Sequence, residues 1–251
     1  PRLGCAEDVE AITPQQLTRH WQEVLTGSRV ELFYAGRRAP QEVAESFARV
    51  FAGHAPVRAA EVGTKPHPKP VQLREVTEEM DVTQGKLVIG LHTGILGTDP
   101  DYPALTLLNA VLGSGMTSKL FVNVREKRSL CYYASSAVER YKGIMQISSG
   151  IEFDKYETAK NAIFHELDEC RQGRITEAEL ESARRGVVSA LRSALDVPAR
   201  LDDYYLGNAV AGGDRVETLL EKISALTKDD LVRAAQRITP DTVYFLKGAQ
   251  T

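Results

Sequence analysis

The chain has 251 residues, 43% of them apolar, which is enough for a substantial core and argues against a disordered chain. A formal charge of −3 and a pI near 6 do not indicate the basic surface that nucleic-acid binding needs. No apolar run is long enough to span a membrane. Three cysteines without CxxC spacing, and the lack of an opening signal segment, lead us to expect reduced thiols and a cytoplasmic location.

A segment near the start of the chain recurs near its end. Residues 12–36 read ITPQQLTRHWQEVLTGSRVELFYAG, and residues 226–248 read LTKDDLVRAAQRITPDTVYFLKG. In both, a Thr that can cap a helix precedes an amphipathic helix with Leu at the same offset (Leu17, Leu231), a polar turn and a strand that ends in Gly. The separation of roughly 210 residues is too long for a solenoid and indicates a duplicated domain, so both segments should have the same secondary structure.

The region after the first copy divides the chain. A predicted helix, PQEVAESFARVFAGH, is followed by three prolines between residues 66 and 70, which prevent regular helix and favour an extended linker. We predict that the chain begins inside one copy of the domain and runs through most of a second. The predicted parts are the tail of a preceding homologous domain, a Pro-rich linker and a second domain: residues 1–58, 59–74 and 75–251.

The second copy alternates between strand and helix patterns before it becomes helical. The expected elements, in chain order, are a strand at 86–95, helices at 101–113 and 116–127, and alternating runs at 131–139 and 143–151 that form an antiparallel hairpin, followed by three or four helices. Strands grouped before helices predict an α+β fold, a two-layer sandwich of a mostly antiparallel sheet with helices packed on one face.

No motif in the chain forms an evident catalytic centre. The five histidines lack HxH, HExxH or HxxEH spacing, and the nearest approach, HELDE at 165–169, reads as a solvated charged helix face. There is no GxSxG elbow, and GSG at 113–115 reads as a tight turn between helices. Cys131 has no histidine near it in the sequence, so an enzyme with a cysteine nucleophile remains a minor alternative.

Several stretches together resemble one peptidase family. They are QGKLVIGLHTGI, DPDYPALTLLNAVLGSGMTSKLFVNVREKRSLCYYASSAV, EFDKYETAKNAI and ITEAELESAR. Over about residues 75–248 the chain resembles the C-terminal, non-catalytic domain of the pitrilysin and insulinase-type zinc peptidases, the inverzincins, which include processing peptidases. The resemblance implies that the zinc site, HxxEH and a downstream Glu, lies in a preceding domain or a partner subunit, so we expect no metal and no catalytic residues in this chain alone.

The same resemblance draws attention to Arg125 and Tyr132. The family's C-terminal domain closes over a chamber and supplies an Arg and a Tyr, seven residues apart, that face the substrate, and these two residues match that pair. A guanidinium can hold a peptide carbonyl, and a phenol can donate to a developing oxyanion. The structural alternative is that Arg125 complements a helix C-terminus while Tyr132 packs on a sheet. Cys131 departs from the Gly or Ala that commonly precedes the family's Tyr, whereas the glycine-rich turn and Ser118 match structural positions.

The resemblance thus implies a fragment of a zinc-metallopeptidase-like protein. We expect it to bind an extended or unfolded peptide at Arg125 and Tyr132 and to complete the chamber of a zinc-bearing domain or homologous subunit. The chain should be inactive alone, and the assembled protein should be a metalloendopeptidase. The alternative is a homologue that has lost catalysis and serves as a structural or docking subunit for an active peptidase.

Overall fold

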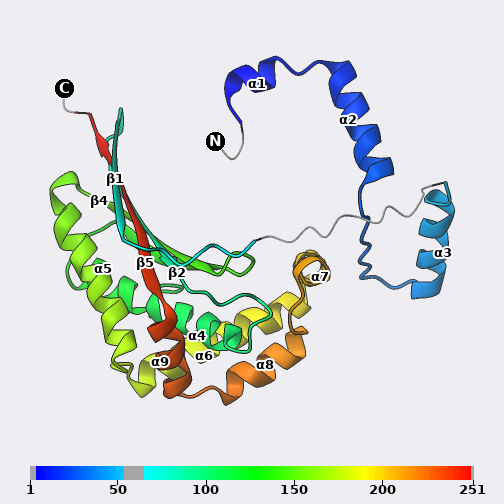
Figure 1. The fold of residues 1–251 in the computed structure, drawn as a ribbon. Helices are drawn as coiled ribbons and strands as arrows, with labels where there is room; N and C mark the ends of the chain where they lie inside the picture. The colour runs from blue at the N-terminus through cyan, green and yellow to red at the C-terminus, as the bar shows by residue number, and fades with distance from the viewer. Residues whose placement is uncertain (1–3, 54–64, 250–251) are drawn as a thin grey trace. The chain divides into compact units, whose positions relative to one another are not determined.

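The structure, a computed structural model, describes residues 4–53 and 65–249. The chain divides into two compact units, residues 1–63 and 64–251, hereafter the N-terminal and C-terminal units (Figure 1). The division falls inside the predicted linker. No helix in the described ranges is long and apolar enough to cross a membrane.

Within residues 4–53, the N-terminal unit consists of helices without a sheet. They are α1 (Ala6–Glu10), α2 (Pro14–Gly27) and α3 (Pro40–Val50), and none of them has a buried residue. The predicted cap of α2 is confirmed, because Thr13 and Gln16 form a reciprocal capping box. The predicted strand that should follow is wrong for this chain: residues 28–35 lie in no strand. Strand formation needs a hydrogen-bonding neighbour, and none pairs with this segment in the described residues.

A five-stranded sheet forms the C-terminal unit. Its strands are β1 (Arg74–Met80), β2 (Gly85–His92), β3 (Tyr133–Glu139), β4 (Ile144–Ile151) and β5 (Thr239–Gly248). Their order is β1-β5-β2-β4-β3, with β1 parallel to β5 and the other three neighbouring pairs antiparallel. The predicted α+β fold with a mostly antiparallel sheet is therefore confirmed, and the three predicted strand segments all lie in this sheet.

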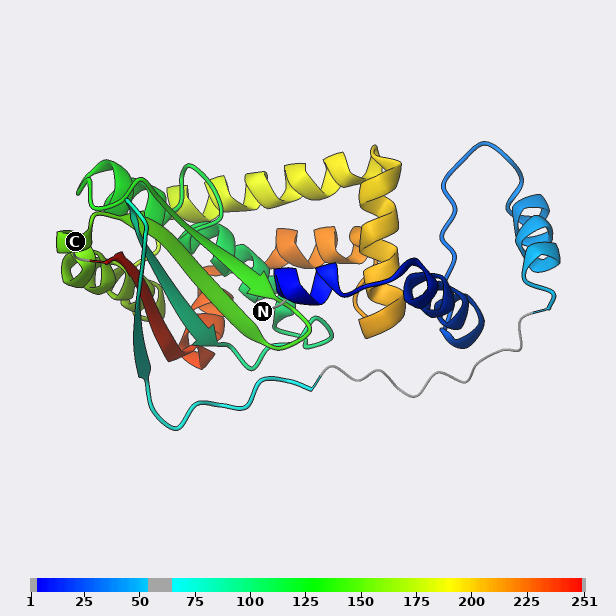
Figure 2. The ribbon, with the colours of Figure 1, turned by 90° about the horizontal axis from the view of Figure 1, so that it is seen from above.

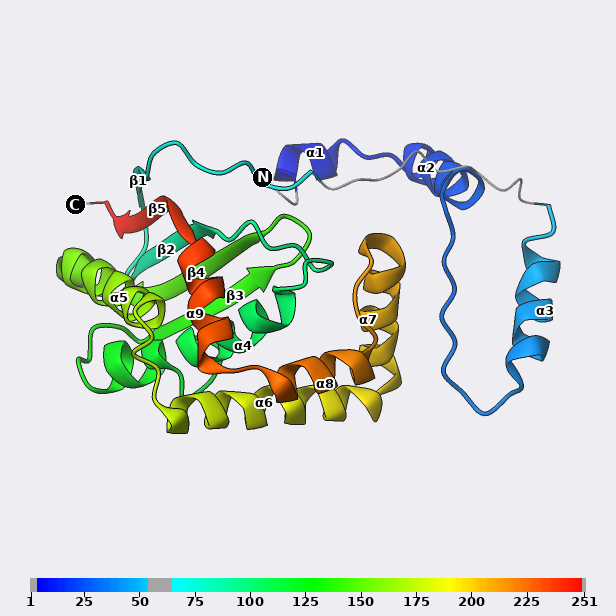
Figure 3. The ribbon, with the colours of Figure 1, turned by 60° about the horizontal axis from the view of Figure 1, so that its bottom comes forward.

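Helices cover one face of the sheet, as Figures 1 and 3 show. The helices of this unit are α4 (Tyr102–Leu112), α5 (Tyr156–Arg171), α6 (Glu177–Leu195), α7 (Pro198–Ala211), α8 (Val216–Ala225) and α9 (Lys228–Arg237), with a π-helix η1 (Leu120–Glu126) and a 3₁₀ turn η2 (Phe153–Lys155). Of these, α7 stands beyond the end of the sheet (Figures 1 and 3). From above, the strands lie in front of the helices (Figure 2).

The side chains of β2 alternate between buried and more exposed positions, which places the hydrophobic core between the sheet and the helices. Leu87, Ile89 and Leu91 are buried and belong to one cluster with Leu105 of α4 and Leu231 of α9. The intervening positions of β2 are intermediate or exposed, which is the period-two pattern of a sheet with one covered face. Each fully buried Leu or Ile contributes about 1.5–3 kcal/mol by removal from water.

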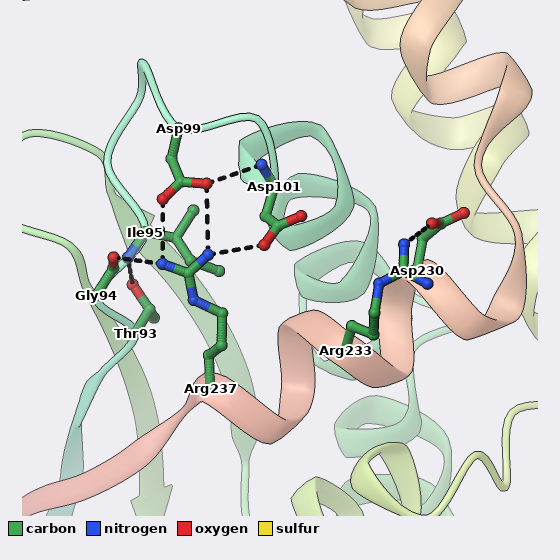
Figure 4. A network of polar contacts seen from close by, with 8 residues as sticks. All are labelled: Thr93, Gly94, Ile95, Asp99, Asp101, Asp230, Arg233 and Arg237. Carbon is green, nitrogen blue, oxygen red and sulfur yellow. Dashed lines mark hydrogen bonds and ion pairs between the residues drawn. The ribbon is translucent and has the colours of Figure 1, made fainter.

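Arg237 ties the end of α9 to the connection between β2 and α4 (Figure 4). Its guanidinium donates to the Gly94 carbonyl at 2.8 Å and to Asp101 Oδ2 at 2.7 Å, and forms an ion pair with Asp99 Oδ2 at 3.1 Å. Partial burial opposes ionisation of Asp99, but hydrogen bonds from Arg237 and from the Asp101 amide outweigh it and lower the pKa of Asp99. The contacts hold this connection in place.

The described part of the predicted linker is anchored to the C-terminal unit. The His67 amide donates to the Lys142 carbonyl at 2.9 Å, and His67 Nε2 contacts Asp241 Oδ2 at 2.6 Å. His92 Nε2 donates to the His67 carbonyl at 3.0 Å. The segment then enters β1, a strand that the sequence analysis missed. Residues 59–64 of the predicted linker, and residues 54–58 of the predicted preceding-domain tail, lie outside the described residues.

Candidate functional site

A π-helix carries Arg125. The sequence predicts an ordinary helix over residues 116–127, but residues 120–126 are wound more widely, with the Lys127 amide donating to the Val122 carbonyl at 3.0 Å. Leu120 and Val124 of this element are buried and fix it to the core. Single π-turns are rare and are frequent at functional sites, so the winding draws attention to the exposed side of η1.

A tight turn after η1 brings Tyr132 back beside Arg125. Ser129 has φ of 49°, a left-handed conformation that costs a non-glycine residue roughly 1–2 kcal/mol. The Ser129 amide donates to the Arg125 carbonyl at 3.1 Å, and the Leu130 amide donates to the Val124 carbonyl at 3.2 Å. The Tyr132 amide then donates to the Gly150 carbonyl of β4 at 2.8 Å, which places Tyr132 next to the sheet.

The Arg125 side chain is held by three neighbours. Its Nε donates to the Tyr132 carbonyl at 2.9 Å, and its Nη1 lies 3.1 Å from Glu126 Oε1. The guanidinium carbon lies 4.6 Å from the centre of the Phe121 ring, within cation–π distance. Within the described part of the chain, Nη2 has no hydrogen-bond partner. The seven-residue spacing therefore brings the Arg125 side chain into a direct hydrogen bond with the backbone carbonyl of Tyr132.

The Tyr132 phenol is available to a ligand. Its side chain is 58% exposed, and its hydroxyl bonds to no group in the ranges that the structure describes. Arg125 and Tyr132 line one hollow of about 390 Å³, hereafter the Arg125 hollow; its other lining residues are Glu126, Ser129, Leu130, Cys131, Glu152 and Lys155. Both residues therefore line one hollow that is open to solvent. Their role in substrate binding stays a prediction.

Cys131 does not have the surroundings of a nucleophile. Burial raises the pKa of its thiol, against a hydrogen bond with Ser149 and the charge of Arg125, which lower it less. No histidine contacts this residue in the described ranges. The cysteine alternative therefore gains no support from the geometry.

The glycine-rich turn and Ser118 have structural roles, as predicted. A Cβ added to Gly113 would lie 2.7 Å from the Ser136 amide nitrogen, because α4 ends against the edge of β3. Ser118 is buried and its hydroxyl donates to the Gly115 carbonyl at 2.7 Å. Both positions shape the approach to η1.

A metal-binding cluster is not found among the described residues, where no group of three His, Cys, Asp or Glu side chains converges. In the HELDE segment, His165 Nε2 lies 3.7 Å from Glu169 Oε1 and is half exposed, which fits a solvated helix face.

A second hollow, which also has Tyr132 and Glu152 in its lining, was missed by sequence reasoning. It measures about 340 Å³ and is lined by Thr83, Gln84, Tyr132, Ile151, Glu152, Phe153 and Asp154, hereafter the Phe153 hollow. These residues come from the β1–β2 connection, the end of β4 and η2. Their proximity depends on the pairing of β2 with β4, which side-chain periodicity does not reveal.

Comparison with known proteins identifies the family. The family model described as "Peptidase M16 inactive domain" matches residues 11–187. A Bacillus subtilis protein described as a probable inactive metalloprotease is 34% identical over 248 residues, which are 98% of this chain and 58% of that protein. A Streptomyces coelicolor protein described as an uncharacterized zinc protease is 24% identical over 94% of this chain and 53% of its own length.

Solved structures agree with the observed fold. A conserved protein from Enterococcus faecalis is 26% identical with a TM-score of 0.89, covering 100% of this chain and 59% of its own. The M16 inactive domain from Pseudomonas fluorescens, at 19% identity and a TM-score of 0.75, shares the fold over 99% of this chain and 60% of its own. The chain spans little more than half the length of the curated relatives it matches. It belongs to the M16 family of zinc-protease-like proteins, and it carries the inactive domain of that family.

Proposed function

We propose that this chain binds an extended peptide at the Arg125 hollow and completes the active site of a zinc-bearing domain, located in the same protein or in a partner subunit. The observation that carries the proposal is that Arg125 and Tyr132 line one solvent-open hollow, in which the phenol hydroxyl has no partner among the described residues. The inactive-domain match supports a role in binding without hydrolysis by this chain alone.

The two side chains offer complementary donors. Contacts with Phe121, Glu126 and the Tyr132 carbonyl fix the guanidinium, so little side-chain entropy is lost when it meets a peptide carbonyl. The Tyr132 hydroxyl can donate a hydrogen bond to a peptide oxygen on which negative charge develops during hydrolysis. The metal chemistry would come from outside this chain.

The capped helices α2 and α9 support the proposal of a preceding homologous domain, whereas the segment after α2 differs from its counterpart because it forms no strand among the described residues. The helices of the N-terminal unit expose large apolar side chains such as Leu17 and Trp21, and a groove of about 730 Å³ runs between α3 and the segment after α2. In the C-terminal unit the strand after the matching helix lies between two others, parallel to β1 and antiparallel to β2. We propose that residues 29–35 occupy the corresponding place in the sheet of that preceding domain.

A second candidate function is a docking subunit without catalysis. The Bacillus subtilis relative, which matches nearly the whole chain, is described as a probable inactive metalloprotease. In this case the Arg125 hollow still binds peptide, but the zinc motif is missing from the rest of the protein. An HxxEH motif upstream supports the first function, and its absence supports the second.

The test uses the assembled protein. Tyr132→Phe should lower kcat more than it raises KM, because a donor to the oxyanion acts mainly in the transition state. Loss of one such donor costs roughly 10²- to 10³-fold in other hydrolases, and we expect this as an upper bound. Arg125→Lys should also lower turnover, because an ammonium cannot reproduce the planar fork. Tyr133→Phe, the adjacent tyrosine that lines neither hollow, is the matched control.

The possible outcomes distinguish the proposed functions from one another. Full turnover by both variants would show that the pair is structural. If the assembled protein does not hydrolyse peptides, calorimetry should still detect peptide binding that Arg125→Ala weakens, which would identify the docking function. Hydrolysis that survives a chelator and is lost on alkylation of Cys131 would instead support the cysteine alternative.

A further inference from the structure

The Phe153 hollow has aromatic walls that face water. Tyr132 is 58% exposed and Phe153 is 40% exposed, and both line it. Two glycines make room for the Phe153 ring: a Cβ on Gly248 would lie 2.9 Å from Phe153 Cζ, and one on Gly85 would lie 3.2 Å from Cδ1. The ring is thus seated against the ends of β2 and β5 by close contacts that a larger residue would disturb.

The charge of this hollow is negative. Asp154 and Glu152 line it, and no Lys or Arg does. Asp154 has no hydrogen bond or ion pair with the described residues, while Glu152 has one ion pair, with Lys155 Nζ at 3.3 Å. The Arg125 hollow is lined by two basic residues, Arg125 and Lys155, as well as by two acidic ones, Glu126 and Glu152. The two hollows therefore differ in charge although they share Tyr132 and Glu152.

Aromatic walls beside carboxylates match one type of side chain. A Lys or Arg side chain can place its methylene stem along the rings and its charged end near Asp154 and Glu152. An acidic side chain would be repelled, and a small apolar one would leave the carboxylates without a partner. The two hollows share Tyr132 and Glu152, and successive residues of an extended peptide are about 3.3 Å apart, so a neighbouring side chain of a peptide held at Arg125 and Tyr132 can reach the Phe153 hollow.

We propose that the Phe153 hollow is a specificity subsite for a basic side chain of the peptide, with Asp154, Glu152 and Phe153 as the determining residues. This inference rests on the proposed peptide-binding function and adds the class of sequence that the site selects.

The test measures binding of capped alanine-rich peptides to the 251-residue chain by fluorescence anisotropy at low ionic strength. The central residue is Arg in one peptide and citrulline, its uncharged isostere, in the other. The Arg peptide should bind roughly five- to tenfold more tightly, as expected for one exposed charge pair with a cation–π contact. Added salt, Asp154→Asn and the double variant Glu152→Gln/Asp154→Asn should each reduce this ratio, the double variant nearly to one.

Asp81→Asn is the matched control. Asp81 is an exposed acidic residue of the same β1–β2 connection that does not line the hollow, so the ratio should be unchanged. If the two peptides bind equally and Arg125→Ala still weakens their binding, the subsite is wrong but the proposed function stands. If neither peptide binds, both the subsite and the proposed peptide-binding function are wrong. A preference for Arg that survives in the double variant would show that the cation is recognised elsewhere.

Discussion

The helices α2 and α9 have the same local signals and different surroundings. Both begin with a Thr capping box, formed with Gln16 in α2 and with Asp230 in α9. Leu17 of α2 is 60% exposed, whereas its counterpart Leu231 is fully buried. The comparison shows that a cap and an amphipathic helix depend on residues within a few positions, while burial depends on distant parts of the chain.

The segments that follow these helices differ more. β5 lies between β1 and β2, so its backbone groups find partners on both sides. The segment after α2 is also rich in β-branched and aromatic residues, yet it pairs with no strand in the described residues. Propensity alone therefore does not form a strand.

Amide hydrogen exchange should separate the two segments most strongly. The amides of Val243 and Phe245 in β5 should exchange only on large-scale opening, with protection on the order of several kcal/mol. The amides of Val30 and Leu32 should exchange at nearly unprotected rates. Mass spectrometry of the 251-residue chain tests this, and the same measurement on a longer protein that includes the upstream region should show protection of residues 30–35. Continued rapid exchange there would contradict the proposed place in a preceding sheet.

Equivalent leucines should have unequal effects on stability. Leu231→Ala should lower the free energy of unfolding by about 2–5 kcal/mol, because it leaves a cavity in the core. Leu17→Ala should change it by no more than about 0.5 kcal/mol in this chain. Urea denaturation followed by circular dichroism measures both, and similar costs for the two variants would show that α2 is packed in solution.

Substitution of two glycines, one in each unit, should also change stability unequally, but by less than the leucine substitutions do. Gly113→Ala should destabilise by about 1–3 kcal/mol, since the added methyl would meet the backbone of Ser136. Gly27→Ala, at the end of α2 with nothing within 4 Å of the added atom, should be neutral or stabilise by up to about 1 kcal/mol. Thermal unfolding of both variants provides the comparison; a neutral Gly113→Ala would mean that the contact with β3 is loose.

The two capping boxes should respond differently to pH. Hydrogen bonds from the Thr227 hydroxyl and amide lower the pKa of Asp230 below its usual 3.8, so its stabilisation is present above the unfolded value and is lost as pH falls through the lowered one. Wild type should exceed Asp230→Asn by up to about 1 kcal/mol at neutral pH, and the gap should close below about pH 4. Gln16→Ala should alter the helix content of α2 without such a pH dependence, as Gln does not titrate. A constant gap for Asp230→Asn would contradict the role of its charge.

The sequence by itself determined most of the helices, the β3–β4 hairpin and the fold class, because caps, turns and side-chain periods act over a few residues. It predicted three or four helices after the hairpin, where the structure has five, α5 to α9. It also singled out Arg125 and Tyr132 through the family resemblance. It did not reveal β1, whose run REVTEEM is exposed throughout and lacks alternation. That strand forms because β5 offers it a parallel neighbour. The π-winding of η1, the left-handed Ser129 and the Arg125 bond to the Tyr132 carbonyl were also decided by tertiary structure, since backbone hydrogen-bond register is set by what the buried Leu120 and Val124 pack against.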